Sequence, residues 1–184
     1  IVQEAEQLAA EGAKELILIA QDTTRYGKDL YGRYALPELL RRLCAVEGPR
    51  WIRLLYCYPE AITDELLDVM AAEKKIVKYM DLPLQHCSQP VLRAMRRAGS
   101  RQELTALLRK LRQRIPGLVL RTTMITGFPG ETEEDFEELC QFAKEMRFER
   151  LGCFAYSQEE GTPAGAMENQ VEPEVRQERR NILM

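Results

Sequence analysis

Five short apolar segments alternate with amphipathic stretches along the chain, and this alternation restricts the possible folds more than any other feature. The segments are Leu16–Ala20, Trp51–Tyr56, Tyr79–Leu84, Leu118–Thr126 and Leu151–Tyr156. They begin about 30 to 40 residues apart, the length that a strand, a helix and two loops require. The sequence therefore predicts an α/β fold whose strands form a parallel sheet through right-handed crossovers.

The stretches between these segments show the 3.6-residue periodicity of helices that cover a sheet with one face. Apolar residues recur at intervals of three and four in 36–43, 104–111 and 136–143. Ser100 and Glu103 form a capping-box pattern before the second of these helices. We expect a helix after each of the first four strands.

Composition excludes several classes of protein. With 184 residues, 45% of them hydrophobic, the chain can form one globular domain. Its formal net charge of −3 is not that of a polycation that coats nucleic acid. No apolar run approaches the roughly 20 residues that cross a bilayer, and the N-terminus does not resemble a signal peptide. We expect a cytoplasmic protein that does not contact a membrane.

The five cysteines lie far apart, at positions 44, 57, 87, 140 and 153. None of them forms the closely spaced pairs of metal and cluster sites, so free thiols in a reducing compartment are the simplest interpretation. His86 is the only histidine, which excludes sites that need several. It is either a buried structural residue or a contact to a ligand.

Polar or glycine residues follow all five predicted strands. Ligands of parallel βα folds bind at the carboxyl edge of the sheet, where these loops meet. The loops contain Gln21 and Asp22, 57–59, Gln85 and His86, 127–131, and 157–161. In 127–131, either a close backbone approach to an uncharged ring or a simple tight turn explains the glycines, because the acidic helix start that follows disfavours a phosphate.

Charged side chains also lie within the predicted strands. Arg53, Asp81 and Arg121 each need a partner or a charged ligand, because an uncompensated buried charge is costly. Strand alternation places four residues of one strand on a common face: Arg121, Thr123, Ile125 and Gly127. A structural Arg–Asp pair and a polar ligand site both remain open.

Charge is segregated between two helical regions. Residues 93–114 contain eight basic side chains and one acidic one, a net +7, and residues 131–145 contain seven acidic and one basic, a net −6. Such runs are commonly solvated helix faces. The alternative is that Arg93–Arg114 binds the phosphates of an RNA-rich partner.

The chain starts at Ile1 within a predicted helix, and it ends within another. A parallel sheet needs a strand before its first helix, so we expect a piece of a larger βα barrel or open sheet. Residues 1–165 then form a partial barrel, and residues 166–184 form a helical extension that leads out of it.

Several stretches at the predicted strand ends resemble the radical S-adenosylmethionine (SAM) methylthiotransferases. They are IAQDTTRYG at 19–27, WIRLLY at 51–56, DLPLQH at 81–86, RTTMITGFPGET at 121–132 and FAYSQEEGTPA at 154–164. Within that family they resemble the RimO type, which modifies an aspartate of a small-subunit ribosomal protein. The sister branch, which modifies a tRNA adenosine, differs at 22–24, 85–86 and 158–160.

The resemblance implies a fold and two kinds of cofactor. The fold is a partial TIM-like (βα) barrel of the radical SAM type, with strands two to six of six in this chain. The cofactors are SAM and 4Fe-4S clusters, one of them held by a CxxxCxxC loop after the first strand. Reduced cluster cleaves SAM, and the resulting 5′-deoxyadenosyl radical takes hydrogen from the β-carbon of the target aspartate. The family also has a second cluster in an N-terminal domain and a C-terminal TRAM domain.

Neither cysteine set of the family is present among these residues. We therefore expect the chain to be inactive alone, with no catalytic residue and no metal ligand of its own. The expected protein partner is the small-subunit ribosomal protein, with ribosomal RNA as a second candidate, and the reductant is not identified by the sequence.

Strand-end positions and the resemblance together predict the ligand-binding residues. Four are expected to make polar contacts with SAM: Gln21, Arg53, Gln85 and Arg121. Arg121 is the natural partner of the SAM carboxylate. The family motif places three more residues beside the adenine: Thr123, Ile125 and Gly127. The candidates for substrate contact are Asp22, His86, Glu159 and Glu160.

Other functions compete with this interpretation. A degenerate barrel could dock on the ribosome through its arginine-rich helix, and the tRNA branch is a second enzyme candidate. A Schiff-base lyase is disfavoured, because no lysine lies at the carboxyl end of a predicted strand.

Overall fold

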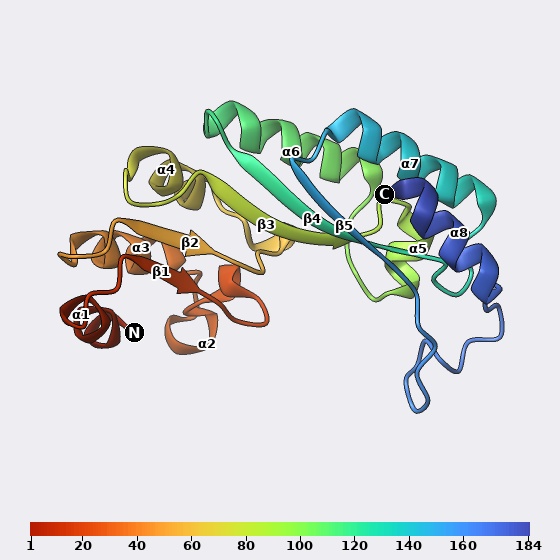
Figure 1. The fold of residues 1–184 in the computed structure, drawn as a ribbon, viewed down its shortest axis with the longest axis horizontal. Coiled ribbons are helices and arrows are strands. Elements are labelled where there is room, and N and C mark those ends of the chain that lie inside the picture. Colours follow the sequence, from red (N-terminus) through yellow and green to blue (C-terminus); the bar gives the residue numbers. More distant parts are fainter. The chain divides into compact units, whose positions relative to one another are not determined.

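Figure 1 shows the fold of the computed structural model, which describes residues 1–184. Its elements in chain order are α1 (Val2–Ala10), β1 (Glu15–Leu18), η1 (Thr23–Arg25), α2 (Lys28–Tyr31), α3 (Leu36–Ala45), β2 (Trp51–Leu54), η2 (Pro59–Ala61), α4 (Asp64–Ala72), β3 (Tyr79–Gln85), α5 (Gln89–Ala94), α6 (Arg101–Arg114), β4 (Val119–Thr126), α7 (Glu133–Met146), β5 (Arg150–Ala155) and α8 (Pro173–Leu183). None of the helices is long and apolar enough to span a membrane.

The chain divides into two compact units. The first unit consists of Ile1–Leu82 with Arg109–Leu120, and the second of Pro83–Leu108 with Arg121–Met184. Residues 165 and 166, between which a boundary is expected, both belong to the second unit, and that boundary stays a prediction.

All five predicted strands are present, with ends that shift by one or two residues. β1 pairs with β2 and β4 pairs with β5, both in parallel, with Ile17 opposite Arg53 and Thr123 opposite Gly152. Helices lie between consecutive strands, as the periodicity predicts. The predicted α/β class with parallel strands is confirmed.

The strands form two open sheets, one of β1–β2 and one of β3–β4–β5, and not a closed barrel. Within the first unit, pairing after β2 is limited to an Ile52–Ile76 bridge and a hydrogen bond of 2.9 Å from the Cys57 amide to the Asp81 carbonyl. Tyr56 adopts a positive φ of 54°, and its amide donates to the Asp81 carboxylate at 3.1 Å. β2 therefore ends early, because a side chain replaces the ladder partner there.

The first unit buries one face of its sheet beneath helices. Leu16 and Ile52 are buried, and α3, which packs on α1 and α4, contributes the buried leucines Leu36, Leu39, Leu40 and Leu43. The opposite face carries Ile17 and Trp51, which are 53% and 51% exposed. The two faces therefore differ in the way that strand alternation dictates.

The second unit has the same one-sided burial. Met124 and Thr126 of β4 are fully buried, and they alternate with the half-buried Thr123 and Ile125. Helix α7 contributes Phe136, Leu139 and Phe142 to the core. In the second unit, α7 and α8 pack together and α8 packs on β5 (Figure 1).

Helix α8, which forms most of the expected helical extension, packs on β5 and α7 of its own unit. Two of its arginines, Arg176 and Arg179, are each only 7% exposed. Their guanidinium groups find partners inside the unit, which is the condition under which a buried charge is tolerated. Helix α8 is thus anchored to the second unit through two buried arginines, while most of its other residues are exposed or half-buried.

The capping box at the start of α7 provides a first test of the fold. The Asp135 amide donates to the Thr132 hydroxyl at 3.2 Å, and the Thr132 amide donates to the Asp135 carboxylate at 3.0 Å. Thr132→Ala removes one half of this exchange and should lower the free energy of unfolding by about 1 kcal/mol in urea titration. Thr132→Ser keeps the hydroxyl and should retain most of the stability; an equal loss in both variants would contradict a capping role.

Candidate functional site

The turn that ends β4 is organised by a buried carboxylate. Gly127 has a φ of +71°, and its amide donates to both oxygens of Glu131, each at 2.9 Å. The Glu131 amide in turn donates to the Phe128 carbonyl at 2.9 Å. Glycine is required at position 127, because the left-handed backbone disfavours a side chain and a Cβ there would lie 2.7 Å from the Cβ of Arg176. The tight-turn interpretation of this segment is therefore sufficient.

The Glu131 side chain is fully buried and needs a counter-charge. Arg179 supplies it: its Nη1 lies 2.8 Å from Glu131 Oε1, and its Nη2 lies 2.8 Å from Glu133 Oε2. Burial acts to lower the pKa of Arg179, but the Glu133 and Glu131 carboxylates outweigh it and the pKa is raised. The guanidinium stays charged in this position.

His86 lies on the other side of the same carboxylate and has no exposed surface. Its Nδ1 accepts the Ser88 amide at 3.0 Å, so the proton of the neutral ring is on Nε2. That Nε2 faces Glu131 Oε2 at 3.4 Å. The ring is fully buried, with Nδ1 hydrogen-bonded and Nε2 without a hydrogen-bond partner. The expected contact with substrate stays a prediction that requires this environment to open.

Ser88 and Asp135 extend the cluster toward α7. The Ser88 hydroxyl donates to Asp135, and Asp135 also closes the capping box with Thr132. Burial acts to raise the pKa of Asp135, but the hydrogen bonds from Ser88 and Thr132 prevail and lower it. The end of β4, the start of α7 and the loop after β3 are thus joined by polar contacts.

The half-buried face of β4 is the second feature of this unit. It presents a guanidinium, a hydroxyl and an apolar side chain: Arg121, Thr123 and Ile125. Ile125 lies opposite Phe154 of β5, which is 65% exposed. Gln85 ends β3, the neighbouring strand, with a φ of +72°. The structure therefore brings four of the seven predicted SAM contacts to one sheet.

Two of the predicted SAM contacts differ from expectation. Arg121 is the third residue of β4 and lies within the strand, whereas a position near its carboxyl end was expected. Gly127 is buried, and Arg176 occupies the space beside its Cα. A bound ring would therefore meet the side of this turn that faces away from α8.

The first unit holds the remaining strand-end candidates. Gln21 is exposed, and Asp22 caps η1 by accepting the Thr24 amide at 3.0 Å. Arg53 pairs with Glu15 at 2.6 Å, and its guanidinium carbon lies 5.0 Å from the centre of the Tyr79 ring. Asp22 and Arg53 thus have structural partners, and their contacts to substrate and SAM stay predictions.

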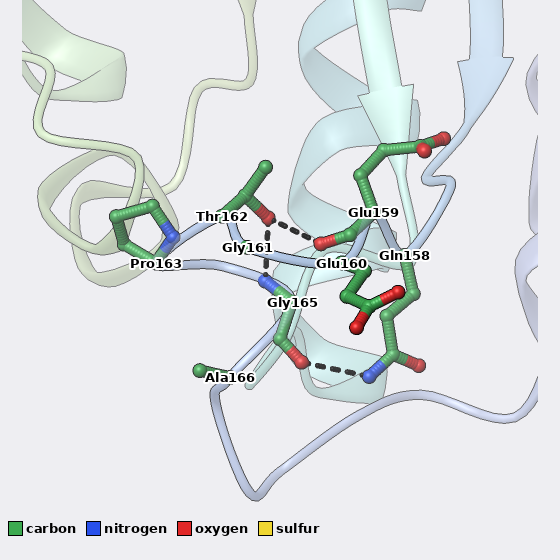
Figure 2. A pocket seen from close by; sticks show the side chains of 8 residues that line it. All are labelled: Gln158, Glu159, Glu160, Gly161, Thr162, Pro163, Gly165 and Ala166. Atoms are coloured by element: carbon green, nitrogen blue, oxygen red, sulfur yellow. Dashed lines mark hydrogen bonds between the residues drawn. The ribbon is translucent and has the colours of Figure 1, made fainter.

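Glu159 and Glu160 lie in an exposed loop that folds on itself. Together with Gln158, Gly161, Thr162, Pro163, Gly165 and Ala166 they line a pocket (Figure 2). Thr162 Oγ1 donates to the Glu159 carbonyl at 2.8 Å and accepts the Gly165 amide at 3.0 Å. These bonds fix the loop backbone and leave both carboxylates exposed for a partner.

The cysteines do not form a ligand set. Cys57, Cys87 and Cys153 are buried, and burial is the main cause that raises their pKa, to about 12 for Cys57. Within residues 1–184, no three His, Cys, Asp or Glu side chains are grouped to hold a metal ion.

The basic region 93–114 is partly neutralised by the chain itself. In the first unit Lys110 pairs with Asp64 at 2.7 Å and Arg114 with Asp64 and Asp68; in the second, Arg101 pairs with Glu145 at 2.8 Å. The solvated-face interpretation accounts for these side chains. Three arginines are exposed without an ion pair: Arg93, Arg96 and Arg109.

The sequence did not reveal the Glu131–Arg179 pair. Its residues are 48 positions apart, and both lie in charge-rich segments that are typical of solvent-exposed helices. The only available signal was Arg176 and Arg179 three residues apart, on one helical face.

Comparison with known proteins gives consistent matches. The model of the radical SAM superfamily matches residues 1–143. The chain is 59% identical over 184 residues to "Ribosomal protein uS12 methylthiotransferase RimO" of Desulfitobacterium hafniense, and 56% identical to the protein of that name from Lachnoclostridium phytofermentans. It covers 41% and 42% of those proteins, so it spans about two fifths of their length.

Solved structures support the fold alone. Coproporphyrinogen III oxidase (HemN) from Escherichia coli, described as a radical SAM enzyme, aligns with a TM-score of 0.75 at 20% identity, over 97% of this chain and 42% of that one. The radical SAM methyltransferase TsrM from Kitasatospora setae aligns with a TM-score of 0.68 at 20% identity, over 90% and 31%.

The β4 turn generates a prediction at Gly127. Gly127→Ala should lower the free energy of unfolding by about 2–4 kcal/mol, because it adds backbone strain to an overlap with Arg176. Thermal or urea unfolding measures the loss. Gly117→Ala is the matched control: that glycine also has a positive φ, of +76°, but nothing lies within 4 Å of its Cβ position. Equal losses at both sites would mean that strain alone, without contact to α8, decides the cost.

Proposed function

This chain belongs to the radical SAM superfamily, and on that premise we propose that it forms the SAM-binding core of a methylthiotransferase that modifies an aspartate of ribosomal protein uS12. The observation that carries the proposal is the high identity, maintained along the whole chain, to relatives that bear this name. A ribosomal target places the reaction in the cytoplasm.

The uncovered face of β4 fits SAM by its chemistry. A guanidinium can bind the carboxylate of SAM with paired hydrogen bonds, and a hydroxyl and an apolar side chain suit the nucleoside. Arg121, Thr123 and Ile125 supply these groups, with Gln85 on the neighbouring strand. These four residues are the proposed binding wall.

A 4Fe-4S cluster does not fit the cysteines of this chain. Their thiols are dispersed, and three are buried, which favours the protonated form. The proposed function therefore assigns the cluster ligands to other parts of the full-length protein. When bound, cluster and SAM supply the radical that removes hydrogen from the substrate, and this chain contributes binding and orientation.

On the substrate side we assign the Glu159–Glu160 loop to contact with the ribosomal protein. The loop backbone is fixed by its own hydrogen bonds, and both carboxylates are exposed. Gln21 and Asp22 are the corresponding candidates in the first unit. Fixed, exposed carboxylates suit a basic partner, which ribosomal proteins commonly provide.

The direct test is a modification assay with the full-length protein. After anaerobic cluster reconstitution, the protein is incubated with SAM, a chemical reductant and uS12, and the uS12 peptides are analysed by mass spectrometry. A methylthio group on an aspartate is the expected product. Modification of a tRNA adenosine instead, or failure to cleave SAM, would contradict the proposal.

Arg121→Met tests the proposed carboxylate contact. Loss of a charged hydrogen bond costs about 1.5–3 kcal/mol, so the Kd of SAM should rise roughly 10- to 150-fold in equilibrium dialysis. Arg150→Met is the control, because Arg150 is the cross-strand partner of Arg121 and is exposed. An unchanged Kd of SAM for Arg121→Met would show that Arg121 does not bind the SAM carboxylate.

A second test concerns ribosomal RNA. We propose that the exposed Arg93 and Arg96 contact phosphates, so the double variant Arg93→Glu/Arg96→Glu should weaken ribosome binding and flatten its salt dependence. Exposed Arg42 in α3 provides the control, as Arg42→Glu makes the same kind of charge reversal elsewhere. If the affinity for the ribosome changes neither with salt concentration nor in the double variant, the proposed phosphate contact is wrong and this region is a solvated helix surface.

A further inference from the structure

Three residues of the segment that follows β5 contact the turn at the end of β4, all within the second unit. Asn169 accepts the Gly130 amide through its carbonyl at 2.8 Å. Arg176 accepts the Thr126 hydroxyl through its carbonyl at 3.2 Å. Arg179 binds the Glu131 carboxylate at 2.8 Å and its carbonyl at 3.2 Å. The turn is thus held from one side by α8 and the residues before it.

Among these contacts, only the one from the Arg179 side chain supplies a counter-charge, to the buried Glu131 carboxylate. Both Glu131 oxygens accept the Gly127 amide, Oε1 also binds Arg179, and Oε2 faces Nε2 of His86 at 3.4 Å. Without Arg179 the buried carboxylate would keep only an amide and an imidazole. A buried carboxylate without a counter-charge either takes up a proton, which makes it a weaker acceptor, or moves toward water, and both outcomes weaken its hold on the Gly127 amide.

The Gly127 amide immediately follows β4, whose half-buried face carries Thr123 and Ile125. If this turn moves, the carboxyl end of β4 moves with it, and so does the end of the face that carries Thr123 and Ile125. We propose that Arg179 is a positioning residue for SAM: through Glu131 it holds the Gly127 turn in the conformation that the β4 wall needs to bind SAM. This inference rests on the proposed function of that wall.

Arg176 provides the comparison that separates positioning from general stability. It is as buried as Arg179 and lies on the same helix. Its guanidinium, however, binds the carbonyls of Val171 and Tyr156 and the side chain of Gln170, and it does not contact Glu131. Arg176→Met keeps the aliphatic stem beside Gly127 and removes those hydrogen bonds together with the guanidinium's contact to the Tyr156 ring, whose centre lies 5.2 Å away.

The experiment uses the full-length protein with four variants: Arg179→Met, Arg179→Lys, Arg176→Met and Arg180→Met. Arg180 is a neighbouring arginine whose Nη1 donates to Asn181 Oδ1 at 3.0 Å. Hydrogen exchange of peptides covering 124–131 is measured without SAM, the Kd of SAM by equilibrium dialysis, and Tm for each variant.

We expect Arg179→Met to accelerate exchange in 124–131 and to raise the Kd of SAM, each roughly tenfold, the scale of one charged hydrogen bond. Arg179→Lys keeps the charge and should recover part of both effects, which also covers the case in which the methionine variant folds poorly. Arg176→Met should lower Tm without changing the Kd of SAM, and Arg180→Met should change neither.

Unchanged exchange in 124–131 for Arg179→Met would overturn the inference. So would a rise in Kd for Arg176→Met as large as that for Arg179→Met at equal loss of Tm, because general destabilisation would then explain both. If the wild-type protein does not bind SAM, the proposed function fails and the inference about SAM falls with it. The exchange data, recorded without SAM, tell that failure apart from a failure of the Arg179 contact.

Discussion

A single buried negative charge organises the second unit. The Glu131 carboxylate has no exposed surface, and the elements around it contribute the groups that a carboxylate needs when it leaves water. The strand end gives an amide, α8 gives a guanidinium, and the loop after β3 places a histidine nearby. Because each donor comes from a different part of the chain, the carboxylate fixes their mutual positions more specifically than apolar packing would.

The parts of the fold that sequence reasoning predicted correctly are those set by local periodicity. Each strand is a short apolar run and each major helix has a one-sided stripe, so their positions follow from a few neighbouring residues. The end of β2 did not follow in this way, because the side chain of Asp81, 25 positions away, takes the amide of Tyr56. The periodicity of apolar residues cannot predict where a side chain takes the hydrogen bond that a neighbouring strand would otherwise accept.

The candidate site shows the same division. The sequence placed Gln85 at a strand end and offered a tight turn as one of two explanations for the glycines at 127–131, and the structure has Gln85 at the end of β3 and a positive φ at Gly127. It could not show that Arg176 fills the space beside Gly127, or that Arg53 pairs with Glu15 across two strands. Those contacts depend on tertiary geometry, since a charged residue in a sequence gives no sign of which distant partner it will meet.

The buried thiols have a consequence for assembly of the complete protein. Burial raises the pKa of Cys57 to about 12, and it raises the pKa of Cys87 and Cys153 as well. Iron binds the thiolate and not the thiol. When iron and sulfide are supplied to the folded protein, we therefore expect these three thiols to compete little with the cluster ligands for iron.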